Sequence, residues 1–155
     1  MLMRIRIIED TLPQGVCGYW HDASRTIWLH DKLNSRQRLC SLQHELIHAG
    51  HHDPGCGGRY GAKCECRCRR ETALALISPV DYGISEEIYG GNAWPMAVEL
   101  GVTIQVLMDY RQQLKQLSPP LLSTNSSQRQ IHSVTCSPNA CLAPFLICLL
   151  YTSDA

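Results

Sequence analysis

Residues 44–48 read His44-Glu45-Leu46-Ile47-His48, and this stretch decides how the chain of 155 residues is interpreted. Two histidines four positions apart on a helix project from the same face, because four residues make slightly more than one turn. Their imidazoles can therefore share one zinc ion, and the intervening glutamate is placed to take a proton from a water held by that ion. The pattern predicts a hydrolytic Zn²⁺ site, with His44 and His48 as metal ligands and Glu45 as the catalytic residue.

The residues around this stretch predict an amphipathic helix. Asn34 or Ser35 can cap its N-terminus, and Gly50 is expected to stop it after Ala49. The side chains expected on its buried side are Leu39, Leu42, Leu46 and Ile47.

The remaining patterns predict a small sheet followed by helices. Residues 4–8 indicate a strand, and residues 15–20 and 26–30 flank a polar turn and indicate a β-hairpin. Helices are expected over residues 63–78, 84–89 and 94–101. A last helix is expected to follow Thr103, which caps its N-terminus. We therefore expect an α+β fold, in which a small N-terminal antiparallel sheet packs on a helical core that carries the HExxH helix.

Composition limits the class of protein. Lysines plus arginines and aspartates plus glutamates number 14 each, so no net field attracts nucleic acid or an anionic membrane. No charged segment followed by an apolar segment opens the chain, which predicts a cytoplasmic protein without membrane attachment. Nine cysteines are an odd count, and in this setting they are expected as thiols or metal ligands rather than as a disulfide framework.

The chain divides near Ser118. Residues 118–155 carry only Arg129 and Asp154 as charges, and their apolar run over 140–151 is interrupted by Pro144 and too short to span a bilayer. Residues 148–155 resemble the translation of a sequencing adapter. We predict one domain over residues 1–117 and a disordered or artefactual tail over residues 118–155.

A catalytic zinc site needs a third protein ligand and an open position. The extended pattern HExxHxxGxxH does not supply it, because position 51 is His and position 54 is Pro. The next predicted helix offers Glu65 and Glu71. Glu65 lies about 70° from the centre of that helix's apolar seam and Glu71 about 170° from it, so Glu65 is favoured and Glu71 is the alternative.

At this point the chain resembles the ImmA/IrrE-type metallopeptidases encoded by phages and mobile elements of bacteria. The resemblance covers most of residues 15–115 and is carried by Thr26-Ile27-Trp28-Leu29, by residues 42–49, by Glu65-x-x-Cys68 leading into residues 72–77, and by residues 97–103. Cys68 stands where that family usually has Ala or Val. The resemblance implies a zincin-like, gluzincin-type endopeptidase that holds Zn²⁺ and acts on a protein substrate such as a transcriptional repressor encoded nearby.

Several other residues leave alternatives open. His51, His52 and Asp53 are either acceptors for the outer nitrogens of the metal-binding histidines or solvated residues beyond a helix end. His21 and His30 are expected to be ordinary polar positions.

Two rival functions concern other parts of the chain. Cys56, Cys64, Cys66 and Cys68 offer four thiols for a non-catalytic metal site or a redox role, although their spacing lacks paired C-x-x-C knuckles. Residues 96–101 and 103–114 form a helix-turn-helix-like pair typical of a DNA-associated regulatory module. Few basic groups lie on the second of these helices, so packing is favoured and direct nucleic-acid binding is not expected.

Overall fold

The computed structural model describes residues 4–53 and 58–117. Within these residues the chain forms three strands and five helices, which confirms the predicted α+β class. The predicted tail over residues 118–155 lies outside the described residues, as does Cys56.

The sheet has the strand order β1-β3-β2, with β1 (Arg6–Asp10) and β2 (Gly18–His21) on either side of β3 (Thr26–His30). The hairpin of β2 and β3 is antiparallel as predicted, but β1 pairs with β3 in parallel. The prediction of an entirely antiparallel sheet was therefore wrong. Residues 11–17 form the connection between β1 and β2, and they are long enough to cross two strand spacings, roughly 10 Å, so that β3 fits between the two strands.

Gly18 allows β2 to approach its neighbours closely. A Cβ atom at this position would lie 2.9 Å from Leu29 Cδ2, 2.9 Å from the Trp28 carbonyl oxygen and 3.4 Å from Glu45 Cγ. A side chain here would push β2 away from both β3 and the glutamate.

We therefore expect Gly18→Ala to destabilise the fold by about 1–3 kcal/mol, as other overpacking substitutions do. Gly83→Ala is the matched control, because its Cβ would meet no atom within 4 Å and the residue lies inside a helix, where alanine is favoured. Urea unfolding of both variants measures the difference. Equal stabilities of the two variants would contradict the close approach of β2 to β3 and Glu45 at Gly18.

Helix α1 (Ser35–His51) carries the HExxH stretch. Asn34 caps it: its side chain accepts a hydrogen bond from the Gln37 N–H, and the Gln37 side chain accepts one from the Asn34 N–H, each at 3.0 Å. The helix ends two residues later than predicted, because Gly50 stays helical and His52 adopts the left-handed conformation with φ 53°.

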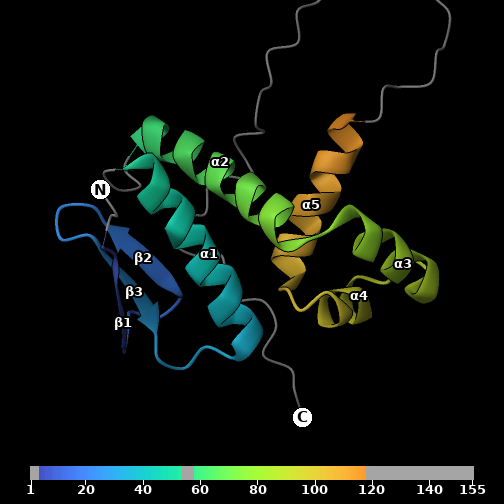
Figure 1. The fold of residues 1–155 in the computed structure, drawn as a ribbon, viewed down its shortest axis with the longest axis horizontal. Helices are drawn as coiled ribbons and strands as arrows, with labels where there is room; N and C mark the ends of the chain where they lie inside the picture. The colour runs from blue at the N-terminus through green and yellow to red at the C-terminus, as the bar shows by residue number, and fades with distance from the viewer. Residues whose placement is uncertain (1–3, 54–57, 118–155) are drawn as a thin grey trace, which may run out of the picture.

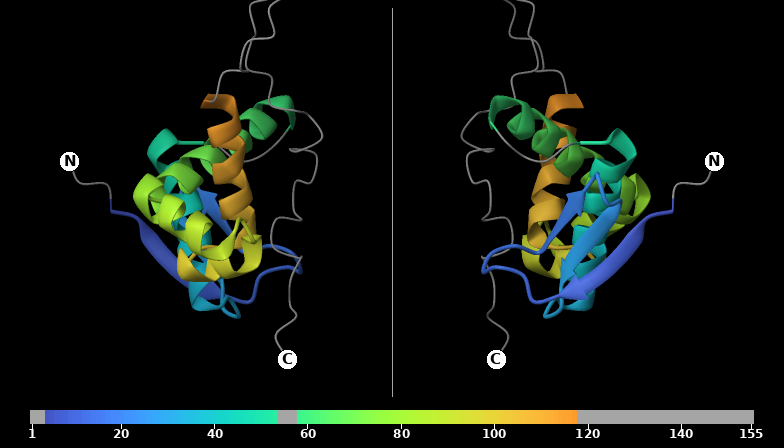
Figure 2. Two further views of the ribbon diagram at one scale, coloured as in Figure 1. Left: turned by 90° about the vertical axis from the view of Figure 1, so that its right-hand side faces the viewer. Right: turned by 90° about the vertical axis from the view of Figure 1, so that its left-hand side faces the viewer.

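The buried face of α1 also differs from the prediction. Leu39 and Leu46 are exposed, whereas the buried residues are Cys40, Glu45, His48 and Ala49. The reason is that α1 lies between two partners, the sheet on one side and α2 on the other, as Figures 1 and 2 show. Its buried residues are those that face these partners.

The other helices are α2 (Gly58–Leu76), α3 (Pro79–Tyr89), α4 (Ala93–Glu99) and α5 (Ile104–Leu117). The predictions started α2 and α3 too late. Pro79 occupies the start of α3, where a missing N–H costs nothing, so the proline separates the two helices and opens the second.

Two groups of buried side chains form the core. One lies between the sheet and α1 and contains Trp20, Ile27, Leu29 and Ala49. The larger group joins α1 and α2 to α3, α4 and α5 around residues such as Met96 and Leu107. Helix α5 packs against α2 rather than standing apart from the domain.

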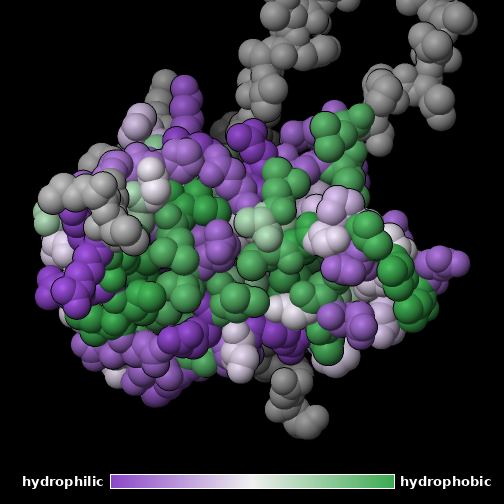
Figure 3. All heavy atoms as spheres, viewed as in Figure 1, coloured by the Kyte–Doolittle hydropathy of each residue, from purple (hydrophilic) through white to green (hydrophobic). Residues whose placement is uncertain are grey.

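Apolar side chains also reach the surface over α3, at the end of the molecule opposite the sheet (Figure 3). Val80, Ile84 and Ile88 repeat every four residues there and are exposed. No described helix combines the length and apolar character needed to cross a bilayer.

Candidate metal centre

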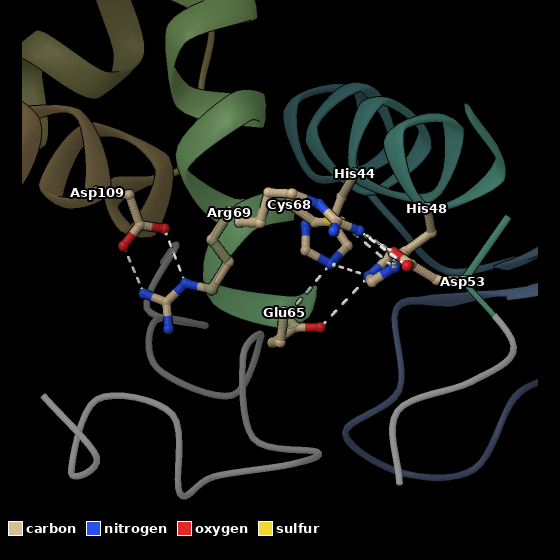
Figure 4. A network of polar contacts seen from close by, with 8 residues as sticks. His44, His48, Asp53, Glu65, Cys68, Arg69 and Asp109 are labelled. Atoms are coloured by element: carbon tan, nitrogen blue, oxygen red, sulfur yellow. Dashed lines mark hydrogen bonds and ion pairs between the residues drawn. The ribbon is translucent and has the colours of Figure 1, made fainter. Parts of the chain in front are cut away.

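The structure brings His44, His48 and Glu65 together, and we call these three residues the triad. The two histidines come from adjacent turns of α1, and Glu65 comes from the first half of α2 (Figure 4). The Nε2 atoms of the two histidines lie 3.2 Å apart. Glu65 Oε1 lies 3.2 Å from His44 Nε2, and Glu65 Oε2 lies 3.4 Å from His48 Nε2.

These separations fit a tetrahedral metal ion. Ligand atoms bound to zinc at about 2.0–2.1 Å with tetrahedral angles lie about 3.3–3.4 Å from one another. The donor set of two imidazoles and one carboxylate is also one that zinc accepts, with a fourth position left open. The three residues therefore fit a Zn²⁺ ion both in chemistry and in spacing.

The alternative third ligand, Glu71, lies away from this cluster. Its Oε2 atom is 2.9 Å from His51 Nε2, and both side chains are more than one-third exposed. This placement agrees with the helical angles, which put Glu71 nearly opposite the apolar seam of α2.

The outer nitrogen of His48 has its own acceptor. His48 Nδ1 lies 2.9 Å from Asp53 Oδ2, and both residues are buried. Arg67 donates hydrogen bonds to both carboxylate oxygens of Asp53, at 2.6 and 2.8 Å. With Nδ1 donating to this carboxylate, Nε2 is directed toward His44 and Glu65, and its lone pair becomes available to a metal once Nε2 has lost its proton.

Asp53 remains ionised in this position. Burial favours the neutral acid, but hydrogen bonds with Arg67 and His48 outweigh it and lower the pKa of Asp53 to about 2. Of the three candidate acceptors, only Asp53 contacts a histidine of the triad. The exposed His51 and His52 pair with Glu71 and Asp22 instead.

We expect Asp53→Asn to weaken zinc binding by about 10- to 100-fold, because loss of a carboxylate that orients a ligand histidine has effects of this size. Asp22→Asn is the matched control, since Asp22 pairs with the exposed His52 outside the triad. Competition with a chromogenic chelator measures both affinities. Equal zinc affinities in the two variants would show that Asp53 does not orient the metal ligand.

Glu45 is buried between the helix and the sheet, with 7% of its surface exposed. It lines the same cavity as His44, His48 and Glu65, and the backbone of Trp20 favours its charged form. Burial raises the pKa of this carboxyl above its usual value, although the nearby histidines oppose the rise. A raised pKa brings a carboxylate closer to the range in which it can both take and return a proton.

The triad is also coupled electrostatically. Burial acts to raise the pKa of Glu65, but hydrogen bonds with His44 and His48 hold it well below its usual range. Burial disfavours a charged His48, but hydrogen bonds with Cys68 and Glu65 raise the pKa of this ring to about 11. In the metal-free protein both ring nitrogens of His48 are therefore protonated at neutral pH, and the ring is positively charged.

Zinc binding should consequently release a proton, because a zinc ligand must be a neutral imidazole. Since the pKa of metal-free His48 lies above neutrality, we expect zinc affinity to rise between pH 6 and pH 8, by about tenfold per pH unit for each proton released. Titration calorimetry in buffers of different ionisation enthalpy measures the release directly. Equal affinities at both pH values would contradict this coupling.

Among the described residues, the thiols of α2 do not gather into the four-cysteine site that was one rival interpretation, and Cys56 lies outside these residues. Cys64 and Cys68 are buried and free, whereas Cys66 is disulfide-bonded. Cys68 Sγ lies 3.4 Å from His48 Nδ1 and 3.7 Å from Asp53 Oδ2. Together with His48 and Asp53, Cys68 makes a second group of candidate ligand atoms, but the 2.9 Å separation of His48 and Asp53 is that of a hydrogen bond. We therefore interpret Asp53 and Cys68 as residues that orient His48 rather than as metal ligands.

A cavity of about 480 Å³ opens beside the triad. The segment leading into β2, together with α1, α2 and α5, lines it. Arg69 of α2 is held in its wall by Asp109 of α5, with the Arg69 Nε atom donating to Asp109 Oδ2 at 3.0 Å. The sequence did not point to Arg67, Arg69 or Asp109, because each gains its role from a partner 14 or 40 positions away along the chain.

Comparison of the chain with protein-family models, with curated proteins and with solved structures found no match.

Proposed function

We propose that the protein is a zinc-dependent endopeptidase built on a zincin-like core, with α1 as its active-site helix. The observation that carries this proposal is the convergence of His44, His48 and Glu65 at tetrahedral spacing beside the buried carboxylate of Glu45. A zinc ion held by the three residues would lower the pKa of a bound water and polarise a peptide carbonyl.

The residues of the chain have separate tasks in this reaction. Glu45 accepts the proton of the attacking water and returns it to the departing amine. Asp53 and Arg67 hold His48 in the orientation that presents Nε2 to the metal.

The edge of the sheet supports the proposal that the substrate is a polypeptide. Cys17 is hydrogen-bonded to His30, so in an antiparallel pair the backbone groups of Gly18 and Trp20 point away from β3. Gly18 and Trp20 line the cavity beside the triad. An extended peptide could add to this edge as a further strand, which would bring its backbone past Glu45.

The resemblance to ImmA/IrrE-type peptidases adds a candidate class of substrate. We propose a regulatory protein, such as a repressor encoded nearby, as the natural substrate. Incubating the protein with such a repressor and analysing the products by mass spectrometry would identify a cleaved bond.

Metal content and hydrolysis test the proposal together. We expect about one zinc ion per chain and cleavage of fluorescein-labelled casein that is lost with 1,10-phenanthroline and restored by zinc, as for other sites with three protein ligands. A folded protein that stays metal-free with zinc in excess would overturn the proposal. Stoichiometric zinc without cleavage of any peptide would leave a non-catalytic metal module.

A further inference from the structure

The cavity continues past the triad along α1 and α2. Cys40 lies one turn before His44 on α1, and Arg69 lies one turn after Glu65 on α2. Thr103, at the start of α5, donates its backbone N–H to Cys40 Sγ at 3.4 Å. This end of the cavity therefore lies between three helices, directly beside the metal-binding atoms.

The charged groups at this end compensate one another. Arg69 and Asp109 form a two-point ion pair, visible in Figure 4 beside Glu65. Gln105 donates a further hydrogen bond to Asp109 Oδ1 at 3.1 Å. The wall thus presents no net charge from this pair, and a charged side chain entering it would lose hydration without gaining a counter-charge.

The remaining wall of this end is small and uncharged. Of the uncharged residues that line the cavity here, which include Ser41, Thr103 and Gln105, we call Cys40, Thr72 and Val106 the neutral subsite. All three residues are buried, and they come from α1, α2 and α5. The neutral subsite lies next to the triad, so a peptide bond held at the triad would place a neighbouring side chain in it.

We propose, on the basis of the peptidase function above, that the neutral subsite binds an uncharged apolar side chain adjacent to the cleaved bond, and that Val106 limits the size of that side chain. One methylene more or less in an apolar pocket changes selectivity by about 10- to 200-fold. Val106 carries the largest apolar side chain of the three residues, and we therefore expect it to set the space left at this end of the cavity.

The test uses the full chain with Glu45→Gln, loaded with zinc, so that peptides bind without turnover. Fluorescein-labelled hexapeptides differ at one central position, which is alanine, leucine, phenylalanine, aspartate or lysine. Fluorescence polarisation should show at least tenfold tighter binding of the leucine or phenylalanine peptide than of the aspartate and lysine peptides. Val106→Phe should reduce the preference for phenylalanine over alanine at least tenfold, and Val106→Ala should increase it.

Met108→Phe is the matched control, because Met108 is exposed on the same helix and does not line the cavity. It should leave the ranking of the peptides unchanged, and thermal unfolding checks that each variant is folded. Tightest binding of a charged peptide, or the same ranking in Val106→Phe, Val106→Ala and the parent, would overturn the subsite. Hydrolysis of the same peptides by the parent protein, which retains Glu45, tests the peptidase function separately. If the peptides bind in the expected order but are not hydrolysed, only the peptidase function is rejected. If they are hydrolysed but bind without the expected order, only the neutral subsite is rejected.

Discussion

Glu45→Gln should retain zinc and lose peptide cleavage, with kcat lower by about 10²- to 10⁴-fold, the range usual for loss of a general base. The substitution keeps the shape of the side chain, and the amide oxygen can still accept a hydrogen bond. It removes only the group that is proposed to exchange a proton. Cleavage of fluorescein-labelled casein, with zinc content determined on the same sample, measures both quantities.

The retained zinc is what makes this experiment decisive. Glu45 is buried, and burial raises the pKa of its carboxyl, so replacing the acid by a neutral amide should not destabilise the helix. A variant that lost zinc and activity together would point to structural damage. A variant with zinc and undiminished cleavage would remove Glu45 from the mechanism.

The local features of this site could be predicted from the sequence because they depend on helical geometry alone. His44 and His48 share a face of α1 since they are four residues apart, and the angular position of Glu65 relative to the seam of α2 separated it from Glu71. Neither inference needed knowledge of how the helices pack. The capping of α1 by Asn34 is similarly local, because the cap and its partner Gln37 are three residues apart.

The features that could not be predicted depend on contacts between distant segments. The parallel pairing of β1 with β3 follows from the path of residues 11–17, which the alternating pattern of β1 does not encode. Leu39 and Leu46 were expected inside, but the sheet and α2 cover a different side of α1. The pair of Arg69 with Asp109 joins residues 40 positions apart, and neither residue has a local signature.

Glu65→Gln and Glu71→Gln form a matched pair on α2 that identifies the third ligand. Loss of a residue that orients a ligand histidine lowers metal affinity by roughly 10- to 100-fold. We expect Glu65→Gln to lower zinc affinity by more than this and to abolish cleavage. Glu71→Gln should leave zinc and activity unchanged. It removes only an exposed ion pair with His51, which contributes about 0–1 kcal/mol to stability.

The same pair of variants also separates a role in metal binding from a role in folding. Glu65 is mostly buried between two histidines, and an amide in its place leaves their facing Nε2 atoms 3.2 Å apart without the negative charge that attracts a cation. If this charge serves the metal, Glu65→Gln should weaken zinc binding far more than it changes the unfolding of the metal-free protein in urea. Stoichiometric zinc in Glu65→Gln, or its loss in Glu71→Gln, would contradict the ligand assignment, because only Glu65 reaches His44 and His48.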